Sequence, residues 1–354
     1  MNAQKYTIGI DLGDRRHAVC VLNARGTIVC EEAVINTREC LTVFAQRHPG
    51  ALVVMETGTH SPWVSRLFEA QGHRVIVANA RKVRAISTNP TKNDQEDARM
   101  LARLGRADPA LLSPVQHRSE AAQRALVHLK VRDALVRSRV SQINTVRFLL
   151  KSLGVQLPRS VKATAFVRKF REHASTADAT LVEPLLQTID ALNARIKELD
   201  VRLEAMADES YPQTARLRQV DGVGPLTALC FVLTVENPAR FPQTRSVGAY
   251  LGLVPRRDQS GLTDKQLPIT KAGNTQLRCL LVNCAHYILG PFGPPSHLRD
   301  TGERIAARGG KSAKKRAVIA VARKLAVTLL ALWKSGAEYQ PLPPAVSPSN
   351  RLAA

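Results

Sequence analysis

The chain has 354 residues, which is enough for two or three domains that each bury a core of their own. Its 51 Lys and Arg residues against 29 Asp and Glu residues give a net charge of +22, which predicts a polyanionic partner, nucleic acid by default. No apolar run approaches the ~18 residues that span a bilayer, and the first residues lack the charged-then-apolar pattern of a signal segment. We therefore exclude membrane and secreted classes and expect a cytoplasmic protein.

The basic surplus is concentrated after residue 110. Residues 1–110 hold 15 Lys and Arg against 11 Asp and Glu, whereas residues 111–354 hold 36 against 18. This division predicts the metal-dependent chemistry in the first part and the nucleic-acid contacts in the second. Aromatic residues make up only 4% of the chain, which favours contacts to phosphates and duplex shape over stacking on splayed bases.

The cysteines never form a C-x-x-C pair, and their surroundings are apolar or helical. They are Cys20, Cys30, Cys40, Cys230, Cys279 and Cys284. This pattern predicts reduced, buried thiols and argues against a disulfide framework or a zinc site.

Residues 6 to about 106 alternate between strand and helix patterns. Three β-branched runs separated by short turns predict a three-strand meander: Thr7–Asp11, His17–Leu22 and Thr27–Ala33. Helix and strand patterns then alternate: Arg38–Arg47, Ala51–Met55, Ser61–Gln71 and Arg74–Ala78. Three antiparallel strands followed by this alternation match the order of an RNase H-like domain.

Four carboxylates are placed where this domain would bring them together. Asp11 ends the first strand, and Glu56 follows the strand expected beside it. Asp94 and Asp97 share one face at the start of a helix expected to pack over the same edge. Oxygen ligands suit hard divalent cations, and two metals ~4 Å apart can cleave a phosphodiester. The four acids therefore predict a metal site, with Asp14 as a turn residue beside it.

The helix that carries the last two acids has an ordinary explanation as well. Asn93 can cap it, with Glu96 as the reciprocal partner of a capping box. Carboxylates such as Asp94 and Asp97 are favoured in a first helical turn by the helix dipole alone. The capping interpretation therefore stays open for this pair.

The middle of the chain predicts two long helices, Ser119–Leu153 and Ala179–Met206, which form an antiparallel helical hairpin or coiled-coil arm. A dimerisation stalk and a direct nucleic-acid contact are both open. The polar face of the first helix is expected to carry its basic residues: Arg124, Lys130, Arg132, Arg137, Arg139 and Arg147.

Two motifs follow the arm. Gly222 and Gly224 form the turn of a helix-hairpin-helix pattern, whose backbone N–H groups would meet a phosphate; a plain glycine turn between packed helices is the alternative.

Ser260 stands in a glycine-flanked loop after Arg256 and Arg257, which could bring a hydroxyl and two guanidinium groups to one scissile phosphate. On bare pattern, such a loop is an ordinary turn.

The last helices are expected to be basic around Lys314, Lys315 and Arg316. The preceding Gly-Lys-Ser is not a P-loop, because Ile305 occupies the position of that motif's first glycine. The Pro-, Ser- and Ala-rich residues 336–354 are predicted to be a disordered tail.

These motifs, in this order, resemble the DEDD-type insertion-sequence transposases from about residue 6 to residue 340. The matching pieces are Gly9-Ile10-Asp11, Met55-Glu56-Thr57, Lys92–Ala98, Gly222–Ala228, and Gly252–Pro255 with Ser260-Gly261. The resemblance implies an α/β RuvC-like, RNase H-like domain (1–108), a helical coiled-coil arm (115–210), a mainly helical transposase domain (211–335) and the tail.

The resemblance also implies the chemistry. Asp11, Glu56, Asp94 and Asp97 would hold Mg²⁺ or Mn²⁺, and Ser260 would attack DNA, leaving a phosphoserine and a free 3′-hydroxyl. The acids and the serine often come from different subunits, which implies a dimer or tetramer. A non-coding bridge RNA would pair with donor and target DNA, so we expect a nucleoid-associated protein. Asp14 departs from the small or basic residue that relatives often carry there, and its part in the metal site stays open.

Three alternatives remain. A RuvC-like Holliday-junction resolvase or nuclease would use metal-activated water and need no serine. A non-catalytic nucleic-acid scaffold would need neither the acids nor the serine. An actin-like ATPase fits least well, because no second phosphate loop follows Asp11 and the later half is helical and basic.

Overall fold

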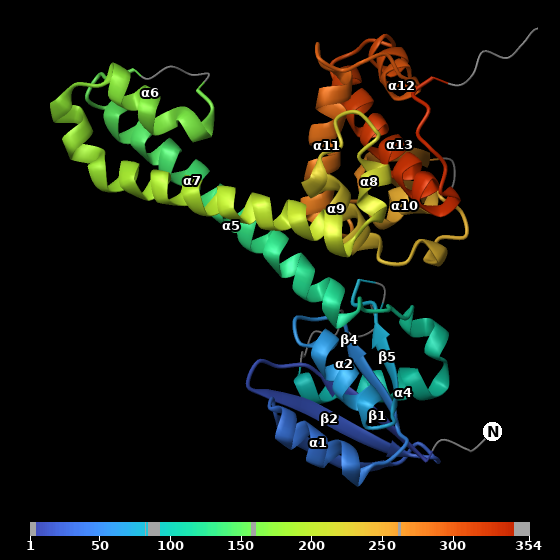
Figure 1. Ribbon diagram of the computed structural model, residues 1–354. Coiled ribbons are helices and arrows are strands. Elements are labelled where there is room, and N and C mark those ends of the chain that lie inside the picture. The colour runs from blue at the N-terminus through green and yellow to red at the C-terminus, as the bar shows by residue number, and fades with distance from the viewer. Residues whose placement is uncertain (1–4, 82, 84–92, 157–160, 261–262, 343–354) are drawn as a thin grey trace, which may run out of the picture. The chain divides into compact units, whose positions relative to one another are not determined.

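Figure 1 shows a computed structural model of the chain, which describes residues 5–81, 83, 93–156, 161–260 and 263–342. The chain divides into two compact units, Met1–Ser119 and Glu120–Ala354. Each unit has its own buried core.

The first unit is built on a five-stranded sheet with the order β3-β2-β1-β4-β5. Its strands are β1 (Tyr6–Asp11), β2 (Arg16–Asn23), β3 (Ile28–Ile35), β4 (Leu52–Glu56) and β5 (Arg74–Ala78). The first three strands are antiparallel to one another, while β4 and β5 run parallel to β1. The predicted meander and the strand–helix alternation after it are therefore confirmed.

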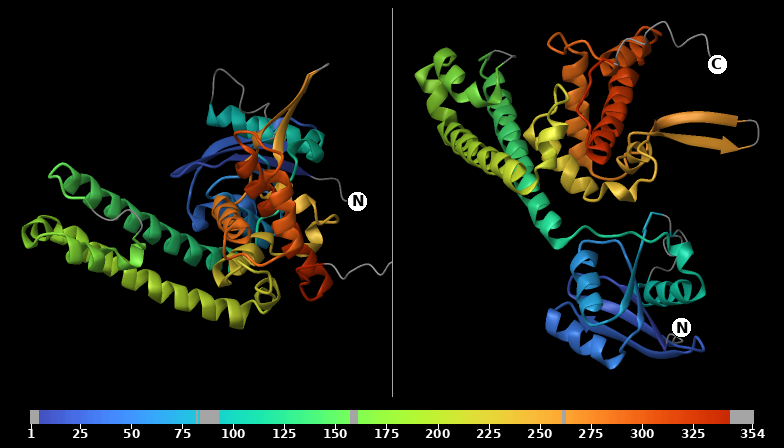
Figure 2. Two further views of the ribbon diagram at one scale, coloured as in Figure 1. Left: turned by 90° about the horizontal axis from the view of Figure 1, so that it is seen from above. Right: turned by 45° about the vertical axis from the view of Figure 1, so that its right-hand side comes forward.

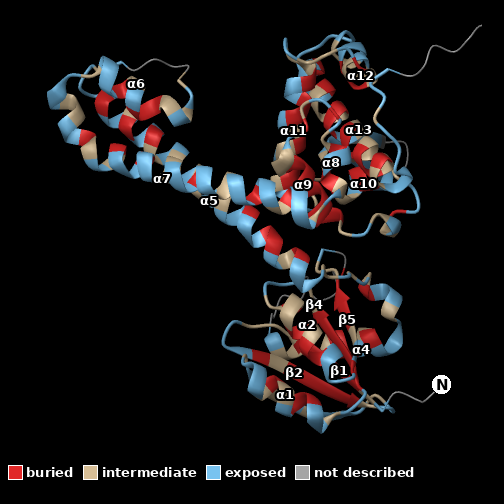
Figure 3. Cartoon of the chain, viewed as in Figure 1, coloured by how far each residue is buried: buried red, intermediate tan, exposed pale blue. Residues whose placement is uncertain are grey.

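Helices cover both faces of this sheet. They are α1 (Arg38–Arg47) and α2 (Ser61–Ala70) on one face and α4 (Asp94–Ala107) on the other, followed by a 3-10 helix (Pro109–Leu112). Phe44 of α1 and Phe68 of α2 pack with Ile8, Ile10 and Met55 of the sheet. The central strands are buried along most of their length, as Figure 3 shows, because both faces are covered.

Small residues let α4 lie close against the sheet. A Cβ atom on Gly9 of β1 would stand 2.0 Å from the carbonyl oxygen of Ala98 and 2.5 Å from the backbone nitrogen of Ala102. A Cβ atom on Gly105 would stand 2.4 Å from Val54 Cγ2 of β4. Only glycine fits at these two contacts, so the sequence fixes how close α4 comes to the first and fourth strands.

The second unit begins with the predicted helical arm. It consists of α5 (Glu120–Lys151), a 3-10 helix (Ala163–Ala165), α6 (Phe166–His173) and α7 (Thr176–Ser210). Arg132 bonds to Asp200, and Arg139 bonds to Asn193. The partners on α7 therefore have lower numbers as the residue numbers on α5 rise. The two long helices are therefore antiparallel, as predicted.

One detail of the arm differs from the expectation. The sequence pattern predicts Arg132 and Arg139 on the polar face of the first helix, but both lie in the seam between α5 and α7. Arg132 binds Asp200 with its Nε atom at 2.6 Å, and Arg139 donates to the Asn193 Oδ1 atom at 2.9 Å. A long side chain can bury its stem and still pair its charged end, which periodicity alone does not reveal.

The rest of the second unit is a helical bundle with one hairpin (Figures 1 and 2). Its helices are α8 (Gln213–Leu217), α9 (Pro225–Val235), α10 (Ser246–Tyr250), α11 (Thr275–Leu289), α12 (His297–Ala306) and α13 (Ala313–Ser335), with a 3-10 helix at Pro238–Arg240. The hairpin strands are β6 (Pro255–Ser260) and β7 (Thr263–Ile269). Residues 227–235 of α9 are buried on every side, which makes this helix the centre of the bundle core.

The six cysteines are free, as predicted. Cys20, Cys230 and Cys284 are buried, but Cys279 is exposed on α11, contrary to the expectation that all would be buried. None of the helices in the described ranges is long and apolar enough to serve as a membrane span.

The predicted tail begins with residues that contact the bundle. The backbone N–H of Tyr339 donates to Gln219 Oε1 at 2.8 Å, and the backbone N–H of His297 donates to the Pro341 carbonyl at 2.8 Å. Residues 343–354, the remainder of that prediction, lie outside the described residues.

Candidate active site

The first two predicted acids are neighbours at one edge of the sheet. β1 and β4 pair in parallel with Ile10 beside Met55, so the next residues, Asp11 and Glu56, stand side by side at the carboxyl ends of the two strands. Carboxyl ends of adjacent parallel strands are a frequent place for binding sites in α/β sheets.

Both acids also face the same side of the sheet. Gly9 and Val54 lie two residues earlier on the two strands, and both contact α4. Side chains alternate along a strand with a period of two. Asp11 and Glu56 therefore project from the sheet face that α4 covers.

The first turn of α4 lies at this edge. Gln95 Nε2 donates to the backbone carbonyl of Val19 at 2.9 Å. Val19 is the cross-strand partner of Ile10, the residue immediately before Asp11. The helix therefore starts over the end of the first strand and runs back across the sheet.

The two acids of that first turn differ in burial. Asp97 is buried on the sheet-facing side of α4, whereas Asp94 is exposed at its start. Asn93 caps the helix as predicted, its Oδ1 atom accepting from the backbone N–H two residues on at 3.0 Å. The predicted reciprocal partner, Glu96, pairs instead with Arg99. Capping alone leaves the burial of Asp97 unexplained, because a first-turn carboxylate can satisfy the dipole from solvent.

The donor chemistry of this edge suits a hard divalent cation. Asp11, Glu56 and Asp97 come from three separate segments and share one face, with Asp94 one turn before Asp97. Carboxylate oxygens are the ligands that Mg²⁺ and Mn²⁺ prefer. Within the described residues, no three Asp, Glu, His or Cys side chains stand close enough together to form a complete metal site.

The predicted nucleophile lies on the hairpin of the second unit. Ser260 was expected in a loop, but it is the last residue of β6, is exposed, and pairs with Thr263 of β7. Figure 2 shows that the hairpin projects from the helices of its unit. Gly261, the next residue of the predicted loop, lies outside the described residues.

The two arginines before the serine have different surroundings. Arg257 forms a bidentate ion pair with Asp264 of β7, with nitrogen–oxygen distances of 2.7 and 2.5 Å. This bond raises the pKa of the Arg257 guanidinium, so the group stays charged. From Arg257 to Ser260 the pairing with β7 is regular, so strand alternation places Arg257 on the face of β6 opposite Ser260. Arg256 is exposed and lies where the register of the hairpin is irregular.

Comparison with known proteins agrees with this set of motifs. A family model for DEDD transposases of the IS110 type, described as Transposase, matches residues 8–154, and one described as Transposase IS116/IS110/IS902 family matches residues 214–297. Together the two ranges cover well over half of the chain, and they contain all four acids and the serine. The chain belongs to the DEDD-type insertion-sequence transposases. It is a DNA transposase, and DNA is its substrate.

Relatives resemble this transposase along most of their length. The transposase of insertion sequence element IS1111A from Coxiella burnetii is 28% identical over 94% of this chain and 91% of its own. The transposase of IS1328 from Yersinia enterocolitica is 29% identical over 78% of this chain and 82% of its own. A pilin gene-inverting protein from Moraxella bovis is 25% identical over 77% of each chain.

A hydrogen-bonded network links the turns that follow β1 and β4 in this transposase. Trp63 Nε1–H donates to His60 Nδ1 at 3.2 Å, which places the imidazole proton on Nε2. That Nε2–H donates to the Asp14 carboxylate at 3.0 Å. Asp14 lies three residues after Asp11, and His60 lies four residues after Glu56. The carboxylate of Asp14 thus faces His60 and connects the two acid-bearing turns.

Asn36 fixes the first of these turns from another side. Its Nδ2 atom donates to the carbonyls of Gly13 and Asp14 at 3.3 and 3.0 Å, and its Oδ1 atom lies 3.0 Å from His17 Nε2. Burial lowers the pKa of His17, so this ring is neutral and donates through Nε2. Sequence reasoning missed His60 and Asn36. The available signal was that Asn36 directly follows β3 and that His60 stands in the short turn after β4.

The predicted nucleic-acid contacts lie on three elements of the second unit. Gly222 adopts a φ of +85°, and a Cβ atom there would stand 2.7 Å from Tyr287 Cδ1, so this glycine is required by packing. Gly224 is the N-cap of α9 and borders open space. The basic residues at the start of α13 are all exposed: Lys314, Lys315 and Arg316.

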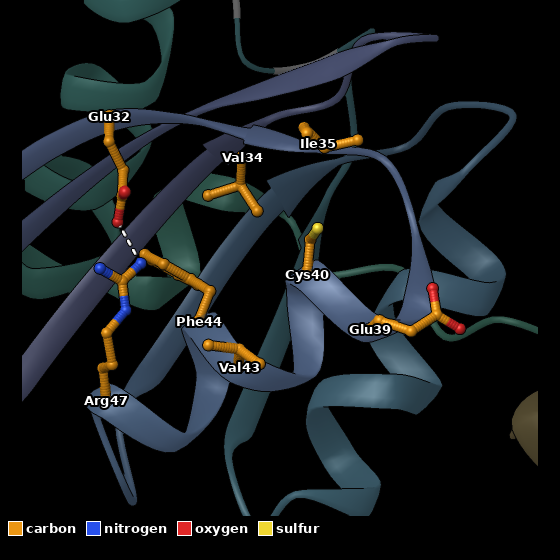
Figure 4. A pocket seen from close by; sticks show the side chains of 8 residues that line it. All are labelled: Glu32, Val34, Ile35, Glu39, Cys40, Val43, Phe44 and Arg47. Atoms are coloured by element: carbon orange, nitrogen blue, oxygen red, sulfur yellow. Dashed lines mark hydrogen bonds and ion pairs between the residues drawn. The ribbon is translucent and has the colours of Figure 1, made fainter.

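A hollow of about 430 Å³ in the first unit is separate from the acids. It lies between β3, an edge strand, and α1 (Figure 4). Val34, Val43 and Phe44 line it, and the ion pair between Glu32 and Arg47 closes one end. None of the four predicted acids lines this hollow, so it is not part of the candidate active site.

Proposed function

We propose that this transposase cuts and rejoins DNA strands with Ser260 as nucleophile and with Asp11, Glu56, Asp94 and Asp97 as ligands of Mg²⁺ or Mn²⁺. The main support is that acids from three separate segments lie at one edge and on one face of the sheet. The strand order, with three antiparallel strands followed by two parallel ones, supports an RNase H-like, RuvC-like domain for residues 1–108.

In the proposed reaction, Ser260 Oγ forms a bond to phosphorus and loses its proton to solvent or a base. The bond from phosphorus to the 3′-oxygen breaks, and that oxygen takes up a proton as a free 3′-hydroxyl. Attack by a 3′-hydroxyl of another strand on the phosphoserine reverses these steps and rejoins DNA. Arg256 would help to neutralise the phosphate, since guanidinium groups bind phosphate oxygens well, whereas Arg257 is held by Asp264 on the face of β6 opposite Ser260. A divalent cation at the acids would add Lewis acidity at a phosphate oxygen.

The remaining parts of the proposal concern partners. A bridge RNA pairs with donor and target DNA, which is supported by the basic second unit and by its scarcity of aromatic side chains. Gly222 and Gly224 act as the helix-hairpin-helix turn at a phosphate. The acids and the serine come from different subunits of a dimer or tetramer. Sequencing of copurifying RNA tests the bridge RNA, and a solution mass measurement tests the dimer or tetramer.

The alternative is a RuvC-like resolvase or nuclease that uses water. Incubation with DNA carrying an end of the element, followed by SDS denaturation, distinguishes the two mechanisms. Serine attack is expected to leave a protein–DNA adduct that survives denaturation and is released by a protease. Cleavage products without any adduct, at all times sampled, would support the nuclease.

His60 is expected to position the two acid-bearing turns. His60→Ala removes the link between the Asp14 carboxylate and Trp63, so we expect Mn²⁺ binding to weaken about tenfold, the lower range for residues that orient metal ligands. His60→Gln keeps an N–H donor for Asp14 and should restore most of the affinity. Calorimetric titration with Mn²⁺ measures both.

The melting temperature separates positioning from simple unfolding. Both His60 variants are expected to melt within a few degrees of the unchanged protein, because the ring is partly exposed. Equal Mn²⁺ affinity in His60→Ala and in the unchanged protein would show that the link does not position the ligands.

A further inference from the structure

One hollow of the second unit lies among α11, α12 and α13. It has a volume of about 750 Å³, within the range of about 300–1,000 Å³ usual for small-ligand sites. Most of the side chains that line it are apolar, including Val282 and Leu289 of α11 and Val318 of α13. The hollow can therefore take up a ligand with an apolar body.

Positive charge borders one side of this hollow. Lys314 and Lys315 line it from the first turn of α13, a turn that holds no acidic residue. The positive end of the α13 dipole adds to the two lysine charges. A ligand that carries an anionic group would be attracted to this charge.

A carboxylate held in a defined orientation also lines the hollow. Glu303 of α12 accepts from Arg299 Nε at 2.8 Å. Arg299 is itself fixed, because its Nη1 atom donates to the carbonyls of Ile288, Gly290 and Gly293 at 3.1, 2.8 and 2.8 Å. Glu303 thus offers an oriented acceptor for an N–H group of the ligand.

We propose that this hollow binds one unstacked nucleotide of a nucleic-acid strand, a proposal that rests on the nucleic-acid chemistry proposed above. The base lies against the aliphatic walls and the His286 ring, its phosphate meets Lys314 and Lys315, and Glu303 accepts from an exocyclic amino group. A carboxylate acceptor suits the N4 amino group of cytosine, which thymine and uracil lack. The occupant is thus an amino-bearing base of single-stranded DNA or RNA.

Photocrosslinking to the full chain tests this assignment. The probes are single-stranded 12-nucleotide DNA and RNA oligonucleotides with one central 5-iodocytosine, and the crosslinked peptides are identified by mass spectrometry. We expect crosslinks to the peptide that contains His286. Ala306→Trp, which fills the hollow, should reduce their yield about tenfold, whereas the neighbouring exposed Ala307→Trp should leave it unchanged.

A second variant keeps the test independent of how well the filled pocket folds. Glu303→Gln should bring the crosslink yields of 5-iodocytosine and 5-iodouracil close to equality. Unchanged crosslinking in Ala306→Trp, or an unchanged ratio in Glu303→Gln, would overturn the proposal. Whichever of the DNA and RNA probes crosslinks more strongly identifies the strand.

The same crosslink measured on Ser260→Ala separates this proposal from the catalytic one. The Ser260 hydroxyl lies on the hairpin and does not line the hollow. If Ser260→Ala still crosslinks and also exchanges strands at the original rate, the serine mechanism is refuted and the nucleotide pocket is not. Strand exchange that needs the serine, without crosslinks at the hollow, would refute the nucleotide pocket alone.

Discussion

Ser260→Ala is expected to lower strand exchange by at least about a thousandfold, because it removes the oxygen that would attack phosphorus. The side chain is exposed at the end of β6, so its loss should change the free energy of unfolding by less than about 0.5 kcal/mol. Binding of DNA should also persist, since the basic groups remain. A recombination assay between donor and target plasmids, DNA binding measured by fluorescence anisotropy, and a denaturant unfolding curve check the three expectations.

Gln259→Ala is the matched control for this experiment. It truncates the neighbouring side chain on the opposite face of the same strand and leaves the serine in place. We expect it to recombine within about tenfold of the unchanged protein. Recombination by Ser260→Ala at the original rate would exclude the serine as nucleophile. An equal loss in both variants would instead indicate that the hairpin acts through its shape.

The sequence predicted the acid edge for a physical reason. An apolar strand that ends in an acid, followed by a second such strand parallel to it, must place both acids at the same end of the sheet. Asp11 and Glu56 satisfy this rule. The close approach of α4, which depends on Gly9, then places Asp97 over that end. Chain order and strand direction are therefore enough to predict where Asp11 and Glu56 lie.

Other parts of the candidate site depend on contacts that no local pattern carries. The β6 strand is polar and exposed on nearly every residue, so it lacks the alternation that would have predicted a strand around Ser260. The hydrogen bonds of His60 and Asn36 to residue 14 span 46 and 22 residues of sequence. The helical pattern predicts Arg139 only as a residue of the polar face, although its guanidinium pairs with Asn193 across the arm. Such pairings are fixed by tertiary packing alone.

Asp11→Asn should be as damaging as the loss of the serine, for a different reason. It keeps the size of the side chain and removes the negative charge, so a divalent cation loses one anionic ligand while the fold keeps its packing. We expect strand cleavage to fall by at least about a thousandfold and Mn²⁺ affinity to fall with it. Cleavage assays over a range of Mg²⁺ and Mn²⁺ concentrations, with calorimetric titration of Mn²⁺, measure both effects.

Asp14→Asn supplies the comparison that gives this result its meaning. It makes the same chemical change three residues along the same turn, but an asparagine Oδ1 can still accept from His60 Nε2–H. We therefore expect a loss of less than about tenfold. A loss as large as that of Asp11→Asn would make Asp14 a fifth ligand. If neither variant lost activity, the acids would have no catalytic role, and the non-catalytic scaffold would become the better explanation of this edge.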